Sequence, residues 1–227
     1  MEAGQRLRDN NNRQVALFPL TGFSISQTDT GTASHGGGAV YWATDYLALD
    51  SNGNRIYRAT CYAPVDMECT FINQAECMAV WTSIAPVHLA NDMIDYLTIT
   101  CYHDNDIENG TYPFMVGSQV RQGEYFFKTG TGGVATGDHL HLETGYGHYT
   151  TNISGASGTP EYKFHITDYT NPKRLHNYNA LFINNTNPID SPTPYVWITY
   201  NGPITSLRKN KFKFVLYANK IRNKKIT

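Results

Sequence analysis

Short runs of β-branched and aromatic residues recur along the chain and are separated by segments rich in Gly, Asn and Ser. Runs of this kind, bounded by turn-forming residues, are typical of β-strands. The predicted strands are Val40–Leu47, Cys61–Ala63, Cys69–Ile72, Met78–Trp81, Tyr96–Tyr102, Tyr125–Lys128 and His139–Thr144. A helical period is confined to the short segment Lys173–Phe182. The pattern therefore predicts a mainly β protein, built as a single antiparallel β-sheet domain with long loops.

The C-terminal segment has a pattern of its own. In Lys211–Tyr217, lysines alternate with Phe212, Phe214 and Leu216, which predicts a strand with one apolar face. From residue 208 onward the chain carries eight Lys and Arg and no Asp or Glu. We interpret this segment either as a solvated basic terminus or as a docking tail for an acidic partner.

Composition narrows the classes of function. The 227 residues include 18 Lys and Arg against 19 Asp and Glu, a net charge of −1. This balance argues against a strongly basic nucleic-acid binder, so no nucleic acid is required as a partner. Because no apolar run approaches the roughly 18 residues of a membrane-spanning helix, no membrane span is expected. The four cysteines, at positions 61, 69, 77 and 101, form no Cys-x-x-Cys pair and are expected to be free, mostly buried thiols.

The segment from His139 to Glu143 (His-Leu-His-Leu-Glu) concentrates the candidate chemistry. Residues two apart on a strand point to the same face, so His139 and His141 are expected side by side, about 6–7 Å apart. This spacing suits one metal ligand and one group that either supports the ligands or acts in catalysis, although two surface histidines would give the same short pattern. The preceding Gly-rich segment 130–138 allows a sharp turn beside the strand. It lacks Gly-Lys-Ser/Thr and a following helix, which argues against a phosphate-binding loop.

Several segments together resemble the lysostaphin-type zinc endopeptidases, a family of peptidoglycan hydrolases. Residues 120–124 and 128–143 are similar to the family's Gly-rich loop and His-x-His strand. The other similar segments are 34–37 with 43–48 (the first metal-binding stretch), 61–68 (a Tyr-Ala-Pro strand and turn) and 96–105 (the strand with a further histidine). The resemblance covers about Phe18 to Glu143, and the order of its motifs makes it more specific than any one of them.

The resemblance implies both a fold and a set of site residues. The fold would be the β-sheet of the lysostaphin-type peptidases, and Zn²⁺ would be held by His35, Asp45 and His141. His103 and His139 would be the catalytic pair that positions or deprotonates water and stabilises the oxyanion. Two imidazoles and one carboxylate leave tetrahedral zinc one open position, which is the composition of a catalytic site. The implied activity is hydrolysis of peptide bonds in the stem or cross-bridge of bacterial peptidoglycan.

The first metal-binding stretch departs from the family pattern. His35 and Asp45 are ten residues apart, where compact family members have four, so the segment 36–41 is expected to bulge out. Tyr41 has the four-residue spacing and competes with His35 as a metal contact. His35 has the better chemistry, because a tyrosine must first lose a proton of pKa about 10. Asp50 is the second choice of carboxylate ligand after Asp45.

The residue before the His-x-His strand also departs from the pattern. Asp138 replaces the proline that is usual in the family. We interpret its carboxylate either as raising the pKa of the neighbouring His139 or as capping the Gly-rich loop.

The N-terminus shows no apolar segment of the kind a secretion signal needs, so synthesis in the host cytoplasm is expected. Together with the resemblance, this suggests a bacteriophage lysin carried in the virion at the tail tip, which acts at the host cell wall during genome entry. The basic tail would dock onto other phage tail proteins. The predicted division is an N-terminal arm (1–17), a zinc endopeptidase domain (18–190, signature region 18–143) and a C-terminal extension with the basic tail (191–227).

Two other classes of function stay open. A catalytically degenerate homologue would serve as a structural tail or cell-wall-binding subunit, and the long spacing between His35 and Asp45 favours it. A carbohydrate- or receptor-binding β domain is suggested by the many Tyr, Trp and Asn residues. That second alternative leaves the ordered motifs unexplained.

Overall fold

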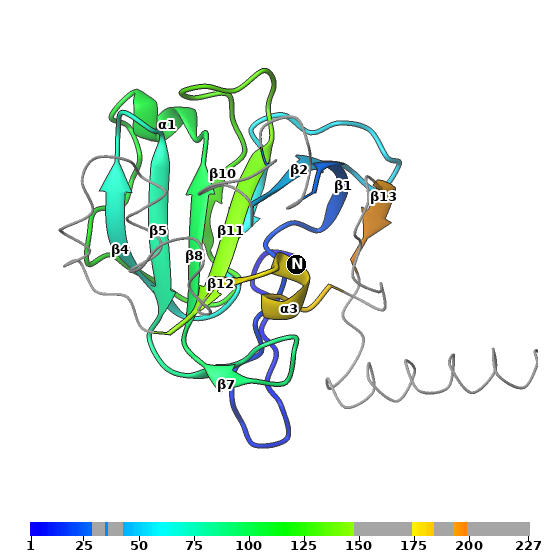
Figure 1. The fold of residues 1–227 in the computed structure, drawn as a ribbon, viewed down its shortest axis with the longest axis vertical. Helices are drawn as coiled ribbons and strands as arrows, with labels where there is room; N and C mark the ends of the chain where they lie inside the picture. The colour runs from blue at the N-terminus through cyan, green and yellow to red at the C-terminus, as the bar shows by residue number, and fades with distance from the viewer. Residues whose placement is uncertain (29–34, 36–42, 148–173, 184–192, 199–227) are drawn as a thin grey trace, which may run out of the picture.

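The chain folds around one large antiparallel sheet. The computed structural model describes residues 1–28, 35, 43–147, 174–183 and 193–198. The sheet has nine strands. Their order is β13 (Thr193–Trp197), β1 (Gly22–Gln27), β2 (Thr44–Ala48), β11 (Leu140–Tyr146), β8 (Leu97–Tyr102), β5 (Met78–Ser83), β4 (Met67–Asn73) and β9 (Gln119–Val120), with β12 (Arg174–Leu175) paired to β11. Figure 1 shows most of these strands side by side, and the predicted mainly β, antiparallel fold is confirmed.

Smaller elements flank this sheet. Strand β10 (Tyr125–Lys128) pairs with β3 (Thr60–Tyr62), and β6 (Val87–His88) pairs with β7 (Ile94–Asp95). The two helices within the described residues, α1 (Asn105–Glu108) and α3 (Asn177–Ala180), are four residues long each. The long connections between the strands therefore have little regular structure of their own.

One face of the sheet carries the hydrophobic core. Along β5, Ala79 and Trp81 point into the main core, and Phe126 of β10 packs on Trp81 with ring centroids 5.8 Å apart. On β11 the core positions are Leu140 and Leu142, both fully buried. Burial of each such large side chain contributes on the order of 1.5–3 kcal/mol. Because side chains alternate along a strand, the residues next to these core positions face the other side of the sheet.

The opposite face of the sheet carries the polar residues of the site beside a small apolar cluster that includes Met78 and Val80. On β11, His141 and Glu143 alternate with the core residues Leu140 and Leu142. On β2, Asp45 lies between the buried Thr44 and Tyr46. On β8 the corresponding position is Tyr102. A slip of one residue in any of these strands would send these side chains into the core. The packing of the core thus holds the polar residues in place.

The predicted arm and extension contact the sheet domain. Met1, Val15 and Leu17 are buried in a small apolar cluster with the partly buried Phe182, and β13 pairs with β1. The division at residues 17 and 190 stays a prediction. The predicted strand in the basic tail lies outside the described residues.

Most predicted elements correspond to observed ones. The predicted strands correspond to β2, β3, β4, β5, β8, β10 and β11, with ends shifted by up to two residues. The predicted start of the first strand, at Val40, lies outside the described residues. The predicted helix is reduced to α3, which follows the short β12. All four cysteines are free and buried, as predicted. Among the described residues, no helix has the length and apolar character needed to cross a bilayer.

Candidate metal centre

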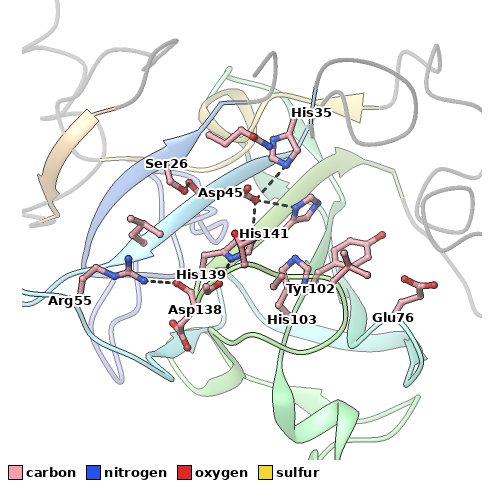
Figure 2. Close-up of a pocket in the computed structure, with 16 residues that line it drawn as sticks. Ser26, His35, Asp45, Arg55, Glu76, Tyr102, His103, Asp138, His139 and His141 are labelled. Carbon is pink, nitrogen blue, oxygen red and sulfur yellow. Dashed lines mark hydrogen bonds and ion pairs between the residues drawn. The ribbon is translucent and has the colours of Figure 1, made fainter. Parts of the chain in front are cut away.

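Asp45, His141 and Tyr102 form a row across three neighbouring strands. His141 of β11 is the register partner of Asp45 on β2 and of Tyr102 on β8. Nδ1 of His141 lies 3.1 Å from Oδ1 of Asp45, and the rings of His141 and Tyr102 are 4.8 Å apart. Figure 2 shows Asp45 at the centre of the site, with dashed lines to three histidines. Strand pairing alone places these side chains together.

His35 reaches the same carboxylate from outside the strands. Its Nε2 lies 3.5 Å from Oδ1 of Asp45, and its ring is 5.1 Å from that of His141. The side chain is only 1% exposed. Its Nδ1 lies 3.0 Å from the carbonyl oxygen of Thr28 and donates to it, since a carbonyl can only accept. The structure therefore brings His35 to Asp45 despite the ten-residue spacing, while Tyr41 lies outside the described residues.

His139 and His103 complete the cluster on the side of the Gly-rich loop. Nε2 of His139 lies 3.5 Å from Oδ1 of Asp45, and the rings of His103 and His139 are 4.6 Å apart. The Nδ1 of His139 donates to the carbonyl of Gly137 at 2.7 Å, and that of His103 to the carbonyl of Gly132 at 2.9 Å. All five predicted site residues thus lie in one cluster.

The donor set fits a divalent cation such as zinc. Oδ1 of Asp45 is buried, and no group donates a hydrogen bond to it with good geometry. Because His35 and His139 each donate from Nδ1 to a carbonyl, Nε2 is the ring nitrogen that each turns toward this oxygen. A buried carboxylate oxygen without a hydrogen bond of good geometry is costly, and a cation among these atoms would remove that cost. Imidazole nitrogens and a carboxylate oxygen are the usual zinc ligands.

Two overlapping trios could hold a metal ion. One consists of His35, Asp45 and His141, and the other of His103, His139 and His141. In each trio the possible ligand atoms lie within 4.8 Å of one another. His141 belongs to both. It also carries a contact that orients its ring, because its Nε2 lies 3.5 Å from Oε1 of Glu143, a fully buried carboxylate. A carboxylate behind a ligating histidine is a common way to fix its orientation.

Electrostatics separates the members of the cluster. Burial alone lowers the pKa of His141, but the carboxylates of Asp45 and Glu143 outweigh it and raise that pKa to about 9. Burial, and then the neighbouring His141 and His139, lower the pKa of His103 to about 4. In the metal-free protein at neutral pH, His141 is therefore protonated, and its positive charge partly offsets the negative charge of Asp45. His103 is neutral at the same pH and can accept a proton.

His103 adopts an uncommon backbone conformation. Its φ is 81°, a left-handed value that only a few per cent of non-glycine residues adopt. The N–H of His103 donates to the carbonyl of Cys77 at 2.9 Å, and its carbonyl accepts from the N–H of Gly132 at 3.0 Å. A Cβ atom on Gly130 would lie 2.1 Å from this carbonyl oxygen. The loop can approach His103 this closely only because residue 130 is glycine.

Asp138 and Asp50 have structural roles. Oδ1 of Asp138 accepts from the hydroxyl of Thr129 at 2.6 Å, and Oδ2 accepts from the backbone N–H of Arg58 at 2.9 Å. This supports the interpretation of Asp138 as a cap of the Gly-rich loop. Asp50 accepts from the N–H groups of Asn52 and Asn54 in a tight turn. The structure does not bring Asp50 into the cluster.

The cluster opens into a groove of about 770 Å³. Its lining includes four residues to which the sequence analysis gave no role, namely Arg55, Glu76, Tyr102 and Ser26. The alternation along the strand ending in Tyr102 is a signal that could have found that residue. The same alternation places Glu143 on the face of His141 and could have predicted that its carboxylate orients that ring. Arg55 and Glu76 lie in connecting segments, where no periodic pattern marks them.

Comparisons with known proteins show similarities in sequence and in structure. No protein-family model matches the chain. A stretch of 129 residues is 33% identical to Morphogenesis protein 1 of Bacillus phage B103, and the match covers 57% of this chain and 32% of that protein. The chain thus spans about a third of the length of this relative. Among solved structures, the chain is similar to a zinc-containing peptidase from Vibrio cholerae, with 15% identity, 61% of this chain and 42% of that chain covered, and a TM-score of 0.38.

Proposed function

We propose that this chain is a zinc-dependent endopeptidase that cleaves peptide bonds in bacterial peptidoglycan. The observation that carries the proposal is the arrangement around Oδ1 of Asp45. This buried oxygen has no hydrogen-bond donor of good geometry, and ring nitrogens of His35, His139 and His141 lie within 3.5 Å of it. A site of this kind, open to a groove, is arranged for a metal ion and a substrate.

The residues proposed to hold the zinc are His35, Asp45 and His141. When bound, Zn²⁺ would act as a Lewis acid that polarises a peptide carbonyl and lowers the pKa of a water molecule bound to it. Thr28 and Glu143 orient the rings of His35 and His141 through the nitrogens that do not face Asp45. Three protein ligands would leave room for water and substrate, which distinguishes a catalytic from a structural site.

His103 and His139 are the proposed acid–base pair. The pKa of His103, about 4, keeps its Nε2 free of a proton at neutral pH, so this atom can accept one from the attacking water. Hydrogen bonds to the carbonyls of Gly132 and Gly137 fix the tautomers of both rings. The proton that Nε2 of His103 takes up would then be donated to the leaving amine, and the ring of His139 would position the attacking water.

We further propose that the protein is part of a phage virion. The 33% identity to Morphogenesis protein 1 of Bacillus phage B103 supports a phage origin. On this proposal the enzyme sits at the tail tip, opens the host cell wall during genome entry, and is synthesised in the host cytoplasm. The basic segment from residue 208 onward would dock onto other tail proteins.

The experiment is digestion of purified peptidoglycan by the zinc-loaded, full-length protein, with the products identified by mass spectrometry. The expected result is fragments with new peptide termini, which identify the bond cut. The control is the His103→Ala variant, which should hold zinc and release far less product. If folded, zinc-loaded wild-type protein leaves the peptides of the wall intact, the endopeptidase proposal is wrong and the degenerate homologue becomes the better account.

A further inference from the structure

Two side chains of opposite charge line the groove on opposite sides of the histidine cluster. Arg55 and Glu76 both contribute to its lining, and Figure 2 shows Arg55 beside Asp138 and Glu76 beyond His103. Neither side chain forms an ion pair with any other residue that the structure describes. The groove therefore presents a positive charge on one side and a negative charge on the other.

Arg55 is held close to His139, and no carboxylate of the described residues is paired with it. Its Nη2 donates to the carbonyl oxygen of Asp138, the residue directly before His139. Its guanidinium lies over the ring of Tyr57, 5.3 Å from the centroid. A guanidinium fixed in this way, with no carboxylate of the described residues paired to it, is suited to a carboxylate supplied by the substrate.

Glu76 has the matching position beside His103. It lies in the turn between β4 and β5, directly before Cys77, whose carbonyl accepts the N–H of His103 at 2.9 Å. Its side chain is exposed. Arg55 is thus hydrogen-bonded to the residue before His139. Glu76 precedes the residue whose carbonyl is hydrogen-bonded to His103. A peptide bond held between these histidines would have Arg55 on one side and Glu76 on the other.

We propose that Arg55 and Glu76 select peptides that carry a free carboxylate on one side of the cleaved bond and an ammonium group on the other. The carboxylate binds to Arg55 and the ammonium group to Glu76. This proposal rests on the proposed endopeptidase function, because it names the substrate class of the same site. Opposite charges at the two sides of the groove also orient the peptide, so that only one direction of the chain fits.

The test uses four peptides that share the sequence of a bacterial stem peptide. The carboxylate is free or amidated, and the side-chain amine is free or acetylated. The dissociation constant by fluorescence anisotropy and the value of kcat/KM are measured for the full-length zinc-loaded protein. The variants are Arg55→Gln and Glu76→Gln. Arg121→Gln and Glu2→Gln are the controls, since they make the same charge changes at exposed positions outside the groove.

The wild-type protein should lose about tenfold in affinity and in kcat/KM when the carboxylate is amidated, with little change in kcat. Acetylation should cost about threefold, because Glu76 is exposed and its interaction is screened by solvent. Arg55→Gln should remove the response to amidation and keep the response to acetylation. Glu76→Gln should do the reverse. The control variants should respond as the wild type does.

The outcomes separate this proposal from the proposed function. Cleavage of all four peptides with equal affinity and kcat/KM would overturn the charge selection and leave the endopeptidase intact. Charge-dependent binding without cleavage of any peptide or of the wall would overturn the endopeptidase and leave the selection. Because the peptides are varied against the wild-type protein, the proposal is tested even if Arg55→Gln does not fold.

Discussion

The candidate site is made of two halves that are built in different ways. Asp45 and His141 lie opposite each other on paired strands, and the core on the other face of the sheet fixes their register. His103 and His139 lie where strand meets loop, and hydrogen bonds to Gly132 and Gly137 hold their rings. The sheet half is thus specified by packing, while the loop half depends on a few backbone contacts. We expect the two halves to fail in different ways when altered.

The largest effect is expected in the sheet half. His141→Ala removes the one residue common to both possible metal trios. Three protein ligands leave none to spare, so this variant should lose zinc and hydrolysis together. Zinc content measured by atomic emission after gel filtration checks this. Stoichiometric zinc in a folded His141→Ala protein would show that the metal binds elsewhere.

The loop half should lose rate but keep metal. His103→Ala and His139→Ala are each expected to hold zinc and to slow peptide hydrolysis on the order of 10²-fold or more, the usual contribution of a positioned acid–base group. Parallel measurements of zinc content and of peptide release from the wall separate the two properties. A variant that digests the wall at the wild-type rate would remove that histidine from the catalytic pair.

A glycine pair tests the backbone of the loop half. A Cβ on Gly130 would lie 2.1 Å from the carbonyl oxygen of His103, whereas a Cβ on Gly137 would meet nothing within 4 Å. Gly130→Ala should therefore cost about 1–3 kcal/mol in unfolding free energy and slow hydrolysis, because His103 must move. Gly137→Ala is the matched control and should change neither. Urea denaturation and wall digestion are the measurements, and equal behaviour of the two variants would refute the close approach.

The smallest effect is the release of a proton from the sheet half when it binds zinc. Because Asp45 and Glu143 raise the pKa of His141 to about 9, zinc must displace a proton from this residue at pH 7. Zinc affinity should rise with pH and level off above about pH 9. In metal-free protein the same shift stabilises the fold below pH 6.5, and this contribution is lost as the pH rises through about 9. Calorimetry in buffers of different ionisation enthalpy measures the proton release; none at pH 7 would contradict the raised pKa.

The two halves also differ in how far the sequence predicts them. Strand alternation in the His-x-His segment places His141 and Glu143 on one face and two leucines in the core, as observed. The separation of Asp45 and His141 could not be derived in this way, because register between strands depends on contacts far apart in sequence. The same limit applies to His35, whose approach to Asp45 involves residues 36–42, which lie outside the described structure.

The elements missed by the sequence analysis are short or carry a weak pattern. Strands β6, β7 and β9 have two residues each, too few for an alternation to be recognised. Strand β1 does contain an alternation, with Phe23 and Ile25 facing the core, and could have been predicted. The left-handed backbone of His103 and the placement of Arg55 have no sequence signal, because both are fixed by tertiary hydrogen bonds.

The most direct test of the central claim is the position of zinc in a crystal of the full-length protein. Anomalous diffraction recorded on both sides of the zinc absorption edge locates the ion without assumptions about its ligands. The account predicts one peak per chain, about 2.0–2.2 Å from a nitrogen of His35, an oxygen of Asp45 and Nδ1 of His141. A peak held by His103, His139 and His141 without Asp45, or no peak from protein saturated with zinc, would contradict it.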